Sequence, residues 1–169
     1  MANLEWSDAL ALDLPAMDDT HQEFVELLAK VENAPDAKLL EQWTELIDHT
    51  DDHFGREDEW MKNTRFASSN CHSMQHKVVL QVMREGQKQG RDGHLAIVRD
   101  MACELALWFP QHAQSMDAAL ALHLRRLGYD PVTGIVTMPD ALPQNIIHGC
   151  VGASCADTVA SVPRTKEMA

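Results

Sequence analysis

Hydrophobic residues recur at steps of three and four along the chain up to about residue 127. This spacing gathers apolar side chains on one side of an α-helix, and no stretch alternates in the way that predicts a strand. Residues 18–20 offer N-cap chemistry for a first helix and Asp36 for a second, while Gly128 is a natural stop for the last. The pattern predicts four helices, from about 18–20 to 33–34, 36 to 62, 70–71 to 89 and 93 to 127.

Four long helices joined by short connections predict an all-α, up-down-up-down four-helix bundle. Residues 1–17 read as an extended N-terminal arm. From residue 130 onward the chain has small residues, four prolines and weak periodicity, which predicts a C-terminal extension and not a second domain. We therefore expect a bundle over residues 1–129 and an extension over 130–169 that packs partly on it through Ile135, Val136, Ile146 and Ile147.

Polar residues interrupt the apolar side of every predicted helix. In the second helix the stripe includes His53 and Glu57, one turn apart. Burying an isolated carboxylate costs several kcal/mol unless the group is paired or bound to a metal. Imidazole and carboxylate without thiolate suit iron, manganese or zinc, and a set of this size fits two octahedral ions that share bridging carboxylates. The candidate metal ligands are His21, His53, Glu57, His72, His76, His112 and Asp117.

The last two candidates do not fit a regular helix. His112 and Asp117 are five residues apart, which is about 140° around a helix of 3.6 residues per turn. Pro110 also removes a backbone hydrogen bond from this helix. The sequence therefore predicts a kink or a local π-type widening between about residues 106 and 117.

The ordered motifs resemble the hemerythrin family, specifically its single-domain bacterial members. The resemblance covers roughly residues 4–127 and rests on Trp6, Asp18 and His21, on HFGRE at 53–57, HSMQH at 72–76 and WFPQHAQSMD at 108–117. It implies a non-haem di-iron centre, with two iron ions joined by an oxo or hydroxo bridge. By the same resemblance His72, His76 and His112 would bind one iron, His21 and His53 the other, and Glu57 and Asp117 would bridge.

The function that the resemblance implies is reversible dioxygen binding for storage, delivery or sensing, without turnover. One alternative is a di-iron oxidase, peroxidase or nitric-oxide-handling enzyme at the same site. The apolar neighbours of the candidate ligands favour binding over catalysis. Ala113 departs from the family, whose members commonly have a bulkier apolar residue there, and a smaller side chain is expected to speed autoxidation.

The cysteines suggest another alternative, an iron- or redox-sensing module that uses Cys150 and Cys155. Cys71 and Cys103 are expected to be packed thiols. His94 and His123 are expected to be satisfied core or half-exposed histidines and not ligands. His49, one turn before His53, is expected at the rim of the bundle, and a supporting or alternative ligand role stays open for it.

The net charge of -12 makes nucleic acids and anionic membrane surfaces unlikely partners. No segment approaches the ~20 apolar residues of a membrane helix, and acidic residues stand where a signal peptide would be basic. Four cysteines without a dense framework fit a reducing compartment. We expect a soluble, cytoplasmic protein that is a monomer or a weak oligomer.

Overall fold

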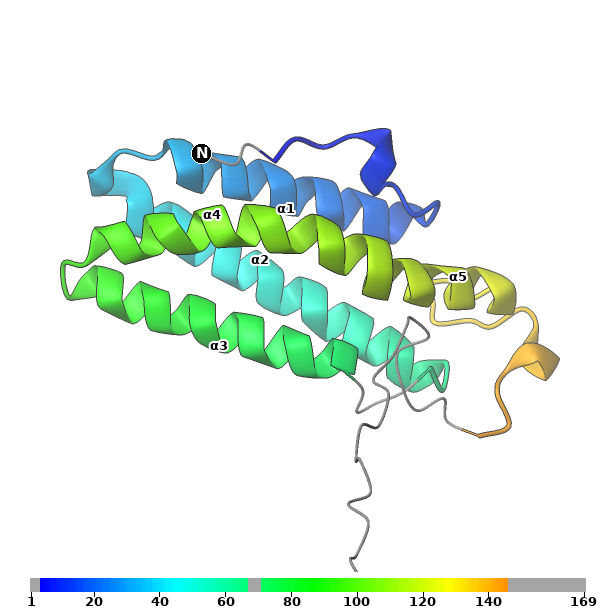
Figure 1. Ribbon diagram of the computed structural model, residues 1–169. Helices are drawn as coiled ribbons and strands as arrows, with labels where there is room; N and C mark the ends of the chain where they lie inside the picture. The colour runs from blue at the N-terminus through cyan, green and yellow to red at the C-terminus, as the bar shows by residue number, and fades with distance from the viewer. Residues whose placement is uncertain (1–3, 67–70, 146–169) are drawn as a thin grey trace, which may run out of the picture.

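The computed structural model describes residues 4–66 and 71–145 and has the predicted bundle (Figure 1). Helix α1 packs against α2 and α4, and α3 packs against the same two helices on the other side. The described residues contain no β-sheet, only an isolated bridge between Tyr129 and Val136. The helices are α1 (Pro15–Asn33), α2 (Asp36–Asn63), α3 (Cys71–Arg91) and α4 (Leu95–His112), which continues through a π-helical turn (Ala113–Asp117) into α5 (Ala118–Leu127). The prediction of an all-α four-helix bundle is confirmed.

Helix α1 begins earlier than predicted. Pro15 takes the first helical position, where its fixed φ suits the helix and its missing N–H is not needed. The carboxylate of Asp18 accepts hydrogen bonds from the backbone N–H groups of Leu12 (2.7 Å) and Leu14 (3.1 Å). Asp18 thus ties the N-terminal arm to the first turn of α1 and does not cap the helix. The arm also contains a short 3-10 helix (Asp8–Leu10), so the prediction of a wholly extended arm was wrong.

The other helix ends lie close to their predicted positions. Pro35, not Asp36, occupies the N-cap position of α2, and Asp36 instead accepts a hydrogen bond from the Arg99 guanidinium at 2.6 Å. Helix α3 runs two residues past its predicted end at 89 and so includes Gly90, which packs closely against Leu40 and Val98. Gly128 ends α5 in the left-handed conformation at φ 56°, as predicted.

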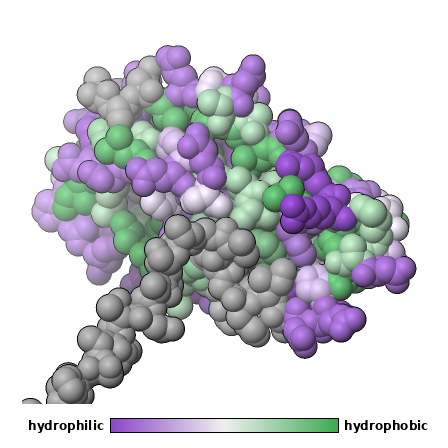
Figure 2. Space-filling model, turned by 45° about the vertical axis from the view of Figure 1, so that its right-hand side comes forward, coloured by the Kyte–Doolittle hydropathy of each residue, from purple (hydrophilic) through white to green (hydrophobic). Residues whose placement is uncertain are grey.

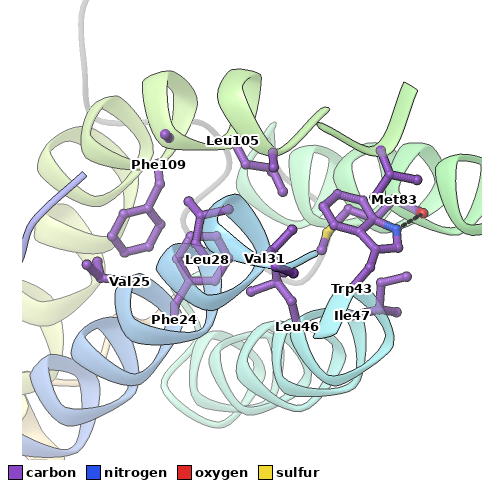
Figure 3. Packing of buried hydrophobic residues seen from close by; sticks show 14 of the residues in the cluster. Phe24, Val25, Leu28, Val31, Trp43, Leu46, Ile47, Met83, Leu105 and Phe109 are labelled. Atoms are coloured by element: carbon purple, nitrogen blue, oxygen red, sulfur yellow. Dashed lines mark hydrogen bonds between the residues drawn. The ribbon is translucent and has the colours of Figure 1, made fainter. Parts of the chain in front are cut away.

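The hydrophobic core is divided into two clusters. The first core cluster lies among α1, α2, α3 and α4 and includes Phe24, Leu46, Leu105 and Phe109 (Figure 3). Within it the indole N–H of Trp43 donates a hydrogen bond to the Met83 carbonyl at 3.0 Å. The second core cluster lies at the opposite end of the bundle and includes Met17, Trp60, Met61, Leu120 and Leu124. Polar residues occupy the layer between the two clusters.

The chain after α5 folds back on the second core cluster. The Thr137 N–H donates to the Gly128 carbonyl at 3.1 Å, and Val136 and Leu142 pack against the cluster. Ile135 is 59% exposed, so the expectation that it packs on the bundle was wrong. The bridge explains this, because consecutive side chains in extended backbone point to opposite sides and Val136 takes the inner one. Ile146 and Ile147 lie outside the described residues.

One expectation for the cysteines was wrong. Cys103 is a free, half-buried thiol, but Cys71 is disulfide-bonded. Cys71 is the first residue of α3 and is only half-buried, so it is not enclosed in the core as a packed thiol would be. Cys150 and Cys155 lie outside the described residues.

Hydrophilic side chains are spread over the face seen in Figure 2, with smaller apolar areas between them. Across residues 4–66 and 71–145, every helix is too short or too polar to cross a membrane.

The close approach at Gly90 makes a testable prediction. A Cβ at Gly90 would lie 2.5 Å from Leu40 Cδ2 and 2.9 Å from Val98 Cγ2. Gly90→Val should therefore lower the free energy of unfolding by about 1–3 kcal/mol, measured by urea denaturation. Gly55→Ala is the control: a Cβ at this mid-helix position would meet no atom within 4 Å beyond its own helical turn, so alanine should raise stability by about 0.5–1 kcal/mol. Equal effects of the two substitutions would contradict the packing argument.

Candidate metal centre

The polar layer between the two core clusters is formed by the seven predicted ligand residues. All are almost completely buried, with exposed fractions between 0% and 2%. His21 follows Met17 of the second core cluster by one turn and precedes Phe24 of the first. The structure therefore brings together His21, His53, Glu57, His72, His76, His112 and Asp117 in one place.

Regular helical spacing explains how α2 and α3 present their pairs. His53 and Glu57 are four residues apart in α2, and His53 Nε2 lies 3.0 Å from Glu57 Oε1. His72 and His76 have the same spacing in α3, with ring centroids 4.4 Å apart. Side chains four residues apart on a helix lie one above the other, so each pair can reach a single ion.

The π-helical turn brings the α4 pair together. The Ala118 N–H donates to the carbonyl of Ala113, five residues earlier, so the backbone is widened by one residue at this point. As a result His112 Nε2 and Asp117 Oδ1 approach to 3.2 Å although they are five residues apart. The predicted local widening is confirmed.

The two oxygens of Glu57 face different histidines. Oε1 lies 3.0 Å from His53 Nε2 and 3.8 Å from His21 Nε2. Oε2 lies 3.3 Å from His72 Nε2 and 3.4 Å from His76 Nε2. The carboxylate therefore stands between His21 and His53 on one side and a group that includes His72 and His76 on the other.

Asp117 divides its oxygens in the same way. Oδ2 lies 3.2 Å from His21 Nε2, whereas Oδ1 lies 2.9 Å from His72 Nε2 and 3.2 Å from His112 Nε2. Both carboxylates thus stand between the same two groups of histidines. This is the arrangement that two carboxylates bridging a pair of cations would need.

The chemistry of these atoms fits a bound cation. Although they are close together, His21 Nε2, His72 Nε2, Glu57 Oε2 and both Asp117 oxygens form no hydrogen bond of acceptable geometry. Leaving buried polar atoms without hydrogen-bond partners costs free energy. These atoms instead lie around two shared positions where a cation could bind. Five ligand atoms from Glu57, His72, His76, His112 and Asp117 lie within 4.8 Å of one another, as do three from His21, His53 and Glu57.

Protons balance the buried charge when no metal does. Burial by itself lowers the pKa of His21, but the nearby Asp117 and Glu57 carboxylates outweigh it and raise the pKa to about 9. The same competition raises the pKa of His72 to about 10. Burial raises the pKa of the two carboxyl groups, yet the surrounding histidines hold the pKa of each well below its usual value. A cation that binds here must therefore displace protons.

Two residues that the sequence did not single out contact the histidine rings from outside. Asp58 Oδ1 lies 3.1 Å from His76 Nδ1, and Gln75 Oε1 lies 3.2 Å from His112 Nδ1. Both contacts join neighbouring helices. The only signal in the sequence is that Asp58 follows Glu57 and Gln75 precedes His76.

The other histidines in the described residues lie outside the cluster. His49 is half-buried, and its Nε2 lies 3.2 Å from the Thr20 carbonyl, so it joins α2 to α1. His123 Nε2 lies 3.0 Å from the Thr64 carbonyl, and His94 is exposed.

A helical bundle with a buried layer of histidines and carboxylates is the architecture of a cation-binding bundle protein. Residues 12–122 match the family model described as the hemerythrin HHE cation binding domain. The chain belongs to the hemerythrin family.

Three bacterial relatives illustrate the similarity. The chain is 35% identical over 130 residues to a bacteriohemerythrin of Ralstonia nicotianae, an alignment that covers 77% of this chain and 95% of the relative. It is 25% identical over 122 residues to a bacteriohemerythrin of Pseudomonas aeruginosa, covering 70% and 79% of the two chains. A bacteriohemerythrin of Stenotrophomonas maltophilia is 26% identical over 125 residues, covering 72% and 81%. No solved structure gives a significant match.

The raised histidine pKa values predict how the metal-free protein responds to alkaline pH. His21 and His72 have folded-state pKa values of about 9 and about 10 against an ordinary value of 6.5. Their contribution to stability is therefore complete below pH 6.5 and is lost as the pH rises through 9 to 10. The free energy of unfolding of the chelator-treated protein, measured with urea, should fall between pH 7 and 10.

The control for this prediction is the metal-loaded protein. Its histidine ligands are already neutral, so its stability should change much less over the same range. A metal-free protein whose stability stays level or rises between pH 7 and 10 would contradict the charge balance described above.

Proposed function

We propose that this protein is a non-haem di-iron protein that reversibly binds dioxygen, for storage, delivery or sensing. The observation that carries the proposal is the division of the Glu57 and Asp117 oxygens between two groups of histidines. A three-histidine position would hold one iron and a two-histidine position the other. In this assignment His72, His76 and His112 form the first, His21 and His53 form the second, and Glu57 and Asp117 bridge.

A pair of ferrous ions would supply the dioxygen binding, and an oxo or hydroxo bridge would complete their coordination. The two-histidine position has one protein ligand fewer, so an iron held there would have room to bind dioxygen. Its surroundings are apolar: the Phe109 ring lies edge-on to His21 at 5.2 Å and stacks on Phe24 at 4.5 Å. Apolar walls exclude water, protons and anions that would compete with dioxygen. This surrounding favours binding over oxidase, peroxidase or nitric-oxide chemistry.

The proposal also covers the partners, the cellular location and the domain organisation of the protein. The net charge of -12 disfavours nucleic acids and anionic membranes as partners. We propose a cytoplasmic monomer or weak oligomer in which residues 1–129 form the functional unit and residues 130–169 are an extension of it. The relatives named bacteriohemerythrin are consistent with an oxygen-binding role.

The direct test is an anaerobic titration of the ferrous, iron-loaded protein with dioxygen, followed by purging with argon. Visible absorption should show a charge-transfer band that appears with dioxygen and fades on purging, at two irons per chain. Direct passage to the fully oxidised spectrum would instead favour an oxidase or a redox-sensing function. A protein that binds no iron would contradict the site assignment.

Ala113 gives a second prediction. It is completely buried in the first core cluster and directly follows His112. If its small side chain admits water to the site, Ala113→Ile should slow autoxidation several-fold, measured as decay of the oxygenated spectrum. Overpacking can cost about 1–3 kcal/mol, so iron content must be measured as well.

Ala106→Ile is the matched control, because Ala106 is also buried in the first core cluster but lies six residues before His112. It should leave the autoxidation rate near that of the wild type. An Ala113→Ile protein with two irons and an unchanged autoxidation rate would show that Ala113 does not admit water.

A further inference from the structure

The five histidines are supported unequally on their outer side. All five bring Nε2 toward the carboxylates, so Nδ1 is the outer nitrogen. His76 Nδ1 lies 3.1 Å from Asp58 Oδ1, and His112 Nδ1 lies 3.2 Å from Gln75 Oε1. In the described part of the chain, the buried Nδ1 atoms of the other three histidines have no hydrogen-bond partner; these are His21, His53 and His72.

The faces of the rings show the same inequality. Phe54 stacks on His76 almost in parallel, with ring centroids 3.9 Å apart and an interplanar angle of 5°. Trp108 stacks on His112 at 4.4 Å and 28°. His21, in contrast, meets Phe109 edge-on at 90°. His76 and His112 are therefore held both on a ring face and at the outer nitrogen.

Each of the two supported rings borders a surface hollow. One hollow of about 290 Å³ is lined by His76 and Asp58, and another of about 240 Å³ is lined by His112 and Gln75. Water in these hollows can compete for the outer nitrogens. Asp58 and Gln75 occupy the hydrogen-bonding positions at these nitrogens in place of water, since both side chains are within hydrogen-bond distance of the rings.

We propose that Asp58 and Gln75 are positioning residues that make the three-histidine position the tighter of the two iron sites. Each oxygen accepts a hydrogen bond from Nδ1–H, which fixes the tautomer and leaves the Nε2 lone pair directed at the metal. The three-histidine position therefore loads first and releases its iron last, while the two-histidine position exchanges its iron more readily. This inference rests on the proposed di-iron function.

The test measures iron release and does not depend on dioxygen binding. The full chain is loaded anaerobically with two ferrous ions and mixed with excess ferrozine, and the coloured iron complex is followed with time. The wild type should show two phases of equal amplitude, a fast one from the two-histidine position and a slow one from the three-histidine position.

Substitution then assigns the slow phase. Asp58→Leu and Gln75→Leu remove the acceptor oxygen and should accelerate the slow phase by about 10–100-fold, with the fast phase unchanged. Asp58→Asn and Gln75→Glu keep an acceptor oxygen and should stay near the wild type. The matched controls are Asp51→Leu and Gln111→Leu, since Asp51 and Gln111 line the same two hollows, and within the described residues neither side chain hydrogen-bonds a histidine of the site.

Several results would overturn the inference. They are a single release phase in the wild type, an unchanged slow phase in the leucine variants, equal acceleration of both phases, or an Asp58→Asn protein that releases iron as fast as Asp58→Leu. Circular dichroism checks that each variant is folded. If a leucine variant does not fold, the Asp58→Asn and Gln75→Glu variants still test the idea. A wild-type chain that binds fewer than two irons would contradict the proposed function itself, whereas two irons released together would contradict only this inference.

Discussion

The fold depends on the burial of two carboxylates in the middle of a helical bundle. Glu57 and Asp117 have no exposure to solvent, and an unpaired charge in that position would cost several kcal/mol. Each is surrounded by imidazoles from its own helix and from neighbouring helices. The bundle can therefore close only if histidines from α1, α2, α3 and α4 converge on the same layer. Protons or cations must complete the charge balance there, so the occupancy of this layer and the stability of the fold are coupled.

Much of this architecture could be predicted because it is local in the sequence. Steps of three and four residues define the helices, and the pairs His53/Glu57 and His72/His76 follow from the same geometry. The structure places all seven candidate ligands in one cluster, as such a pattern predicts. The widened turn was also predictable, because five residues separate His112 from Asp117 and a regular helix would turn them apart.

The features that the sequence did not predict depend on contacts between elements. Asp58 contacts a histidine of α3 and Gln75 a histidine of α4, so neither contact is visible until the neighbouring helices are placed. The start of α1 was misplaced for a similar reason. Asp18 has the chemistry of an N-cap, but its carboxylate reaches back to the arm and leaves Pro15 to begin the helix. Side-chain chemistry alone does not tell which backbone groups a residue will meet.

The polar layer also has a consequence for cooperativity. It separates the first core cluster from the second, so hydrophobic contact alone does not join the two ends of the bundle. The four helices run through the layer, but the side-chain contacts that couple the ends pass through the buried histidines and carboxylates. Bound metal would then cross-link the helices at this layer, so that the two ends unfold as one unit. Without it two separate apolar clusters are connected across the polar layer by continuous helices, so we expect the two ends to unfold less cooperatively.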